Sequence, residues 1–192
     1  MIPHEIRHLV WPAVTPNCLV LTEEFYFELL ERKNLGWVSK EVKSQIEKDI
    51  VRSFSVRDSL EKKEGLKLEV TEVLEMFHLY RPDISYVQGM TYPIIVLTLV
   101  VGKVKAFQVF ANLVLGNSFF RKMYLFEPHF IQAVAKAFQI LLYDYQYDVA
   151  EKLAKLNIDP QLFLIEWFYT IFSRSLSFEG TLKLWDQLLY HG

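Results

Sequence analysis

The chain lacks features that several protein classes require. Cys18 is its only cysteine, which excludes an intramolecular disulfide and a metal cluster built from thiolates of this chain alone. A single cysteine fits a reducing compartment such as the cytosol. Among 192 residues there are only 7 glycines and 7 prolines, which is few for an all-β protein with many tight turns.

A strong charge and a long apolar run are also missing. The formal net charge is −2 with no long run of one sign, so we expect no nucleic-acid partner and no strong attraction to anionic membranes. The longest apolar run, near Tyr92 to Val101, is much shorter than the roughly 20 residues of a membrane-spanning helix. We expect it to form a buried core helix. The first eleven residues lack the apolar centre of a signal peptide.

The chain is rich in apolar residues, and many of them recur at helical spacing. Hydrophobic residues make up 52% of the chain and aromatic residues 15%, enough for a large packed core. One helical face is expected to consist of Leu66, Val70, Val73, Leu74, Phe77 and Tyr80. The sequence shows no sustained alternation of apolar and polar residues of the kind that is typical of strands. The sequence therefore predicts one all-α domain over residues 1–192, with about eight to ten helices by typical helix length.

Several positions predict where helices begin and end. Pro82 is expected to end the helix before it, because the residue preceding a proline disfavours the α region. Ser39 is predicted to cap a helix that buries Val42, Ile46 and Ile50. Asp159 followed by Pro160 has the pattern of another helix start. The polar stretch of residues 53–65 is expected to be an exposed loop.

A metal-binding reading rests on one short string. Residues 4–8 (His-Glu-Ile-Arg-His) match the HExxH pattern of zinc hydrolases. That pattern needs a helical context and a third ligand, whereas this string runs directly into Trp11-Pro12. We expect no metal site and keep a small zinc hydrolase only as an alternative. The chain also has no GxxxxGK[ST], GxGxxG or GxSxG motif, so we expect no nucleotide-binding loop and no nucleophile elbow of its own.

One segment with potential chemistry is residues 46–52. Asp49 and Arg52 are three positions apart, so their side chains are neighbours on a helix. The carboxylate would orient the guanidinium at the edge of the core, and a planar guanidinium suits phosphate oxygens. The alternative is an ordinary surface ion pair, which is common and weak. Val51 faces away from the apolar stripe, and a partner on that face would explain it.

A second such segment is residues 86–90, after the break at Pro82-Asp83. Gln88 is predicted at a junction of loop and helix, where its amide would accept a hydrogen bond from a water and donate one to an oxyanion. Gly89 would allow a close approach of the backbone. The alternative is that Gln88 is a simple helix-start residue.

Together, these segments resemble the TBC domain family of Rab GTPase-activating proteins. The family is marked by the motifs RxxxW, IxxDxxR and YxQ in that order. The chain carries all three, at Arg7–Trp11, Ile46–Asp49–Arg52 and Tyr86–Gln88. Longer strings also match the family, namely Ile2-Pro3, Arg52-Ser53-Phe54, residues 85–90, Trp167-Phe168, Phe172-Ser173-Arg174 and Leu184-Trp185-Asp186. Each piece is unspecific alone, but their common order across the chain is specific.

The resemblance implies an all-helical fold and a GTPase-activating role in vesicle trafficking. Arg52 would be an arginine finger that neutralises charge developing between the β- and γ-phosphates, and Gln88 a glutamine finger that positions the attacking water. Asp49 and Tyr86 would support the fingers, whereas Arg7 and Trp11 would be structural or would shape the floor near the site. GTP and Mg²⁺ would belong to a Rab-family partner, so the chain would bring no cofactor and complete the partner's catalysis rather than act on a substrate of its own.

The chain departs from the family pattern at a few places. Ser85 stands where the family usually has glycine and Val87 where it often has cysteine, but neither change removes a finger. The chain ends soon after Leu184-Trp185-Asp186, where the family continues with further helices. We therefore interpret the chain as a TBC domain truncated at its C-terminus.

Three functional alternatives remain open at this stage. The first is the catalytic activator, and the second is a catalytically silent TBC-like module that binds a GTPase or scaffolds other partners. The third is a generic helical interaction domain or the zinc hydrolase. For the activator we expect a cytoplasmic protein that contacts endomembranes indirectly, through its GTPase or through flanking segments.

Overall fold

The computed structural model describes residues 2–55 and 64–191, and in these ranges all regular secondary structure is helical. A short 3-10 helix, η1 (His4–Ile6), leads into the first α-helix. The α-helices of the described residues are α1 (Arg7–Val14), α2 (Glu23–Asn34), α3 (Lys40–Ser55), α5 (Glu64–Tyr80), α6 (Thr91–Val101), α7 (Lys103–Gly116), α8 (Ser118–Tyr124), α9 (Pro128–Tyr145), α10 (Tyr147–Lys155), α11 (Gln161–Tyr169) and α12 (Phe178–His191).

The all-α prediction is confirmed, but eleven α-helices exceed the expected eight to ten. One of these boundaries lies at Gln146, which has no proline or glycine beside it, and another directly follows Gly116, the last residue of α7. At Asn117 the backbone turns extended, and the side chain accepts a hydrogen bond from the Phe119 N–H at 2.8 Å, so that α8 starts separately from α7. Gln146 similarly separates α9 from α10, with φ −145° and ψ 57°.

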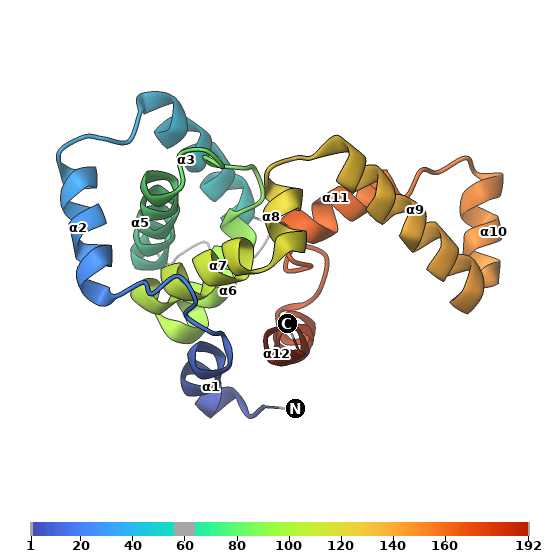
Figure 1. Cartoon of the computed structure of the whole chain (residues 1–192), viewed down its shortest axis with the longest axis horizontal. Helices are drawn as coiled ribbons and strands as arrows, with labels where there is room; N and C mark the ends of the chain where they lie inside the picture. The colour runs from blue at the N-terminus through green and yellow to red at the C-terminus, as the bar shows by residue number, and fades with distance from the viewer. Residues whose placement is uncertain (1, 56–63, 192) are drawn as a thin grey trace.

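The centre of the larger part of the molecule is α6, which packs against α5, α7, α1 and α3 (Figure 1). Every residue from Thr91 to Thr98 is buried, so the predicted core helix is confirmed. Burial on all sides explains the absence of a polar face on this helix. Within the described residues, none of the helices has both the length and the apolar character needed to cross a membrane.

The predicted helix ends agree with the structure. The Ser39 hydroxyl accepts a hydrogen bond from the Val42 N–H at 3.3 Å at the start of α3, and Val42, Ile46 and Ile50 are buried. Helix α5 ends at Tyr80, two residues before Pro82. At the start of α11, Asp159 accepts from the Gln161 N–H at 2.8 Å.

The loop predicted for residues 53–65 is wrong at both of its ends. Ser53 and Phe54 are buried in the last turn of α3, and Gly65 belongs to the first turn of α5. Phe54 continues the apolar face of α3, whereas Gly65 is exposed within the first turn of α5. Residues 56–63 lie outside the described part of the chain.

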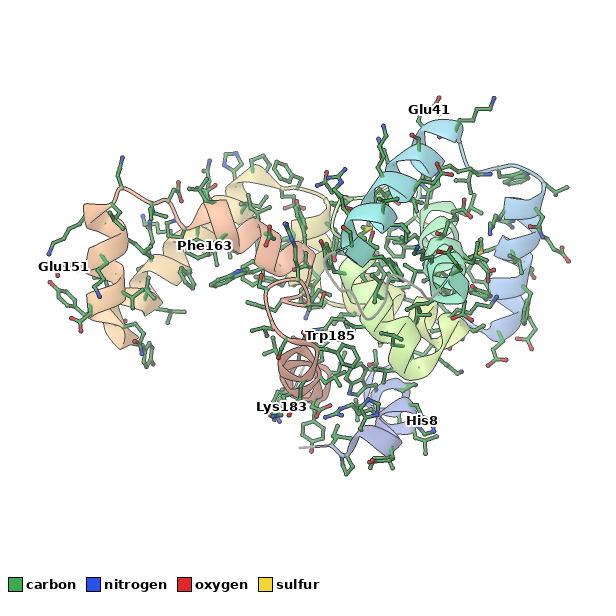
Figure 2. All side chains as sticks on the ribbon, turned by 180° about the vertical axis from the view of Figure 1, so that it is seen from behind. His8, Glu41, Glu151, Phe163, Lys183 and Trp185 are labelled. Atoms are coloured by element: carbon green, nitrogen blue, oxygen red, sulfur yellow. The ribbon has the colours of Figure 1, made fainter. Side chains whose placement is uncertain are left out.

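The two ends of the described chain are joined by a buried polar cluster. The Asp186 carboxylate accepts hydrogen bonds from Arg7 Nε at 2.9 Å, Arg7 Nη2 at 3.0 Å and Trp11 Nε1 at 3.0 Å, and from the Ile2 N–H at 3.2 Å. Burial alone would raise the pKa of Asp186, but these hydrogen bonds and the Arg7 charge outweigh it, and the pKa is lowered. Figure 2 shows the consequence, with α1 beside α12.

The HExxH string does not lie on a continuous α-helix, which the zinc-binding form of this pattern requires. Residues 4–6 form a 3-10 turn, and the α-helix begins only at Arg7. His4 and His8 are exposed. In the described ranges, no group of three or more His, Cys, Asp or Glu side chains is arranged to hold a metal ion.

Helices α9 and α10 form an antiparallel pair that extends away from the larger part of the molecule (Figure 1). Few of their residues are buried, with Ile131 and Ala135 on α9 and Ala150 on α10. Helix α11 returns along α9 and α8 and brings the chain back beside the site described next.

Candidate functional site

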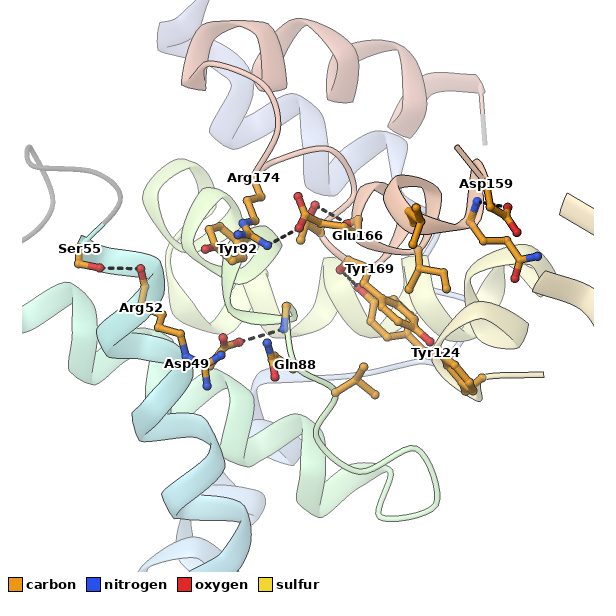
Figure 3. Close-up of a pocket in the computed structure, with 17 residues that line it drawn as sticks. Asp49, Arg52, Ser55, Gln88, Tyr92, Tyr124, Asp159, Glu166, Tyr169 and Arg174 are labelled. Atoms are coloured by element: carbon orange, nitrogen blue, oxygen red, sulfur yellow. Dashed lines mark hydrogen bonds and ion pairs between the residues drawn. The ribbon is translucent and has the colours of Figure 1, made fainter. Parts of the chain in front are cut away.

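A cavity of about 820 Å³ opens between α3, the loop before α6, and α11 (Figure 3). Arg52 reaches it from the last turn of α3, and Gln88 reaches it from the loop. Both side chains are exposed, and Figure 3 shows them side by side at one edge of the cavity. The two residues that the sequence analysis singled out are therefore brought together on one accessible rim.

Asp49 does not orient Arg52 as the helical spacing suggested. Among the described residues, no ion pair joins the Asp49 carboxylate to the guanidinium, and the alternative of a surface ion pair also fails. Asp49 is 3% exposed and faces the core, whereas Arg52 faces solvent. A buried carboxylate needs donors close to it, and those donors come from the Gln88 loop.

Three donors converge on one oxygen of Asp49. The Gly89 N–H and the Thr91 hydroxyl each donate to Oδ2 at 2.9 Å, and the Tyr86 hydroxyl donates to the same atom. Burial first, and then the Asp49 charge and hydrogen bond, raise the pKa of the Tyr86 phenol, so it stays a neutral donor. The helix that carries Arg52 thus holds the loop that carries Gln88 on both sides of the glutamine.

Thr91 is a site residue that the sequence analysis missed. Its hydroxyl is fully buried and lies 3.0 Å from the Tyr86 hydroxyl as well as contacting Asp49. A hydroxyl at the first position of a largely apolar helix was the available signal, because such a group needs a partner when it is buried.

The backbone of the loop uses two left-handed conformations. Gly89 has φ +103°, and a Cβ there would lie 3.5 Å from Thr170 Cγ2 and 3.7 Å from Tyr169 Cβ. Ser85 has φ +59°, a region that non-glycine residues seldom occupy. Ser85 is the position at which the resembled family usually has glycine, and the left-handed backbone is a physical reason for that preference.

The opposite wall of the cavity is built by α11 and the residue stretch after it. Glu166 and Arg174 form an ion pair there, and the Arg174 guanidinium lies 5.8 Å from the centre of the Tyr92 ring. Two apolar side chains also border the cavity and face solvent, with Leu162 76% exposed and Phe126 56% exposed. The sequence analysis had noted Arg174 within a family string and Asp159 as a helix start, but it did not predict that either residue lines a cavity.

Arg7 and Trp11 are not part of this cavity. Both are buried in the cluster around Asp186, where they join α1 to α12. Of the two roles that the resemblance left open for them, the geometry gives them the structural one.

Comparison with known proteins agrees with this architecture. Residues 4–192 match the family model of the Rab-GTPase-TBC domain, so the chain belongs to that family. It is 26% identical over 208 residues to human TBC1 domain family member 14 and 28% identical over 216 residues to mouse TBC1 domain family member 12, with 96% of this chain covered in each case. It is also 29% identical over 200 residues to mouse Carabin, with all of this chain covered.

The same fold occurs in a solved structure. A Chlamydomonas flagellar RabGAP TBC domain superposes with a TM-score of 0.82 at 20% identity, covering 100% of this chain and 63% of that chain. The chain spans 29% of the length of each of the two TBC1 family relatives and 42% of Carabin.

Proposed function

We propose that this chain is a GTPase-activating domain for Rab-family small GTPases, supplying Arg52 and Gln88 to the partner's active site. The observation that carries this proposal is the exposure of both side chains at one cavity edge, with Asp49 linking the elements that bear them. GTP and Mg²⁺ enter with the partner, and the chain brings no cofactor of its own.

Arg52 acts as the arginine finger. Its guanidinium enters the partner's site and neutralises the charge that develops between the β- and γ-phosphates as the bond to the leaving group breaks. An arginine supplied in this way accelerates hydrolysis about 10³–10⁵-fold, which corresponds to roughly 4–7 kcal/mol of activation free energy. The Arg52 side chain is exposed and forms no ion pair with a carboxylate of the described residues, which leaves the guanidinium available for phosphate oxygens.

Gln88 acts as the glutamine finger. Its carboxamide accepts a hydrogen bond from the attacking water and donates one towards the γ-phosphate, so that the water lies in line with the breaking bond. Correct placement requires a rigid loop. The three hydrogen bonds to Asp49 support that rigidity.

The setting of this activity follows from its partner. A Rab-type partner places the chain in vesicle trafficking, in the cytoplasm, with endomembrane contact only through the GTPase or flanking segments. With a net charge of −2, we expect no nucleic-acid partner.

Single-turnover GTP hydrolysis with a panel of purified Rab GTPases tests the proposal. We expect stimulation with at least one member, and a loss of one or more orders of magnitude in both Arg52→Ala and Gln88→Ala. Arg32→Ala is the matched control, because Arg32 is an exposed arginine on α2 that does not line the cavity. Binding of a GTPase without stimulation would support the silent module instead, and equal activity in the wild type and both finger variants would reject the two-finger mechanism.

A further inference from the structure

A strained turn follows α11, and the residues that lead into it lie beside the Gln88 loop. Ile171 and Phe172, which follow α11, have φ values of +45° and +60°. Two consecutive non-glycine residues in the left-handed region are unusual, and a β-branched isoleucine is especially disfavoured there. Such a backbone persists only when the surrounding contacts hold it in place.

The contacts that hold this turn come from three other elements. The Trp185 indole N–H on α12 donates to the Ile171 carbonyl at 2.9 Å, and both residues are fully buried. The Tyr124 hydroxyl on α8 donates to the Tyr169 carbonyl at 2.7 Å. The Phe172 N–H returns to the Trp167 carbonyl at 2.7 Å. The indole contact is the one that links the turn to the cluster of α1 and α12.

Tyr169 and Thr170, which lead into this turn, lie beside Gly89 of the Gln88 loop. A Cβ built on Gly89 would lie at ordinary van der Waals distance from Thr170 Cγ2 and Tyr169 Cβ, so little more than the width of one carbon atom separates the two segments. On its other side, the Gly89 N–H is held by Asp49. Gly89 directly follows Gln88, so a shift of Thr170 towards Gly89 would reach the residue next to the carboxamide.

We infer that Trp185 is a positioning residue for Gln88, acting through its hydrogen bond to the Ile171 carbonyl and the placement of Thr170 beside Gly89. The inference rests on the proposed function, since it assigns Gln88 its role in hydrolysis. It gives the Leu184-Trp185-Asp186 segment two distinct tasks. Asp186 joins the two ends of the described chain, and Trp185 holds the turn that follows α11, beside the Gln88 loop.

Trp185→Phe tests this, because it keeps an aromatic ring in the core and removes the indole N–H. Tyr26→Phe is the matched control, since it removes a buried aromatic donor, the 2.6 Å bond to Glu72, far from the cavity. In single-turnover hydrolysis we expect Trp185→Phe to lower the maximal stimulated rate about tenfold, with the half-saturating concentration unchanged. We expect Tyr26→Phe to leave both quantities within about twofold of the wild type.

A double-mutant cycle separates positioning from general destabilisation. In the Gln88→Ala background, Trp185→Phe should cause no further loss of rate, because the group that it positions is gone. In the Arg52→Ala background it should still cost about tenfold. Equal losses in both backgrounds, or an equal loss in Tyr26→Phe, would overturn the inference.

A readout without a GTPase keeps the inference separable from the proposed function. Amide hydrogen exchange of the peptide covering residues 86–91 should be about tenfold faster in Trp185→Phe and unchanged in Tyr26→Phe. If the wild type activates no GTPase but this exchange responds, the proposed function fails and the mechanical link stands. If the exchange does not change, the link fails whatever the activity is.

Discussion

The Asp49 carboxylate accepts the Gly89 N–H at 2.9 Å, and this contact joins the helix bearing Arg52 to the loop bearing Gln88. A single buried group therefore links the two elements that carry these exposed side chains. Relative placement matters because a displacement of about 1 Å can reduce a catalysed rate by about 10²-fold. The rigidity of the site comes from the buried acceptor, while the exposed side chains remain free to engage a partner.

Asp49→Ala should lower the free energy of unfolding by about 3 kcal/mol, because it leaves three buried donors without their acceptor. Urea denaturation followed by circular dichroism measures the change. Asp83→Ala is the control, since Asp83 pairs with Arg81 at the surface and should cost no more than about 1 kcal/mol. Similar losses in the two variants would contradict the role assigned to Asp49.

Asp186→Asn should change how stability depends on pH. The pKa of Asp186 is lowered from 3.8, so the stability that its carboxylate contributes is fully present above that value and is lost as pH falls through the lower pKa of the folded state. We expect the wild type to lose stability below about pH 4 and the variant to be less stable at neutral pH, with a flatter acid limb. Thermal melts from pH 7 to pH 2 measure this, and parallel curves would contradict it.

Leu162→Glu should weaken the productive encounter with a GTPase. Leu162 is 76% exposed at the border of the finger cavity, so a charge there would meet any apolar surface that the partner brings. We expect the half-saturating concentration to rise about tenfold with the maximal rate little changed. Leu68→Glu is the control, because Leu68 is 72% exposed on α5 and does not line the cavity. An equal effect of Leu68→Glu would show that Leu162 has no special role in binding the GTPase.

Tyr169→Phe should not lower stability. Within the described chain, the Tyr169 hydroxyl is buried without a hydrogen-bond partner, and burial raises its pKa to about 12. Removing an unsatisfied buried hydroxyl is neutral or favourable, unlike the removal of a paired one. Tyr124→Phe should lower stability, because the Tyr124 hydroxyl donates a hydrogen bond to the Tyr169 carbonyl. We expect its loss to reduce the free energy of unfolding by about 1–2 kcal/mol. Thermal melts of both variants decide between these expectations.

Local patterns in the sequence predicted most of the helices. The apolar face of α5, the Ser39 cap and the helix end before Pro82 follow from 3.6-residue periodicity and from the hydrogen-bond needs of helix ends. The break at Gln146 was not foreseen, because glutamine is not a strong helix breaker and no glycine or proline lies beside it.

The sequence by itself determined the helical class, the family and the two residues that reach the cavity edge, because motif spacing and helical periodicity are properties of neighbouring positions. The tertiary structure alone decided what Asp49 binds, that Thr91 joins it, and that Arg7 and Trp11 lie with Asp186 rather than beside the cavity. These relationships join segments distant in the chain, and a buried charge takes whichever donors the packed core brings to it. The periodicity of one helix places Asp49 next to Arg52, but the fold turns the carboxylate inward and the guanidinium outward.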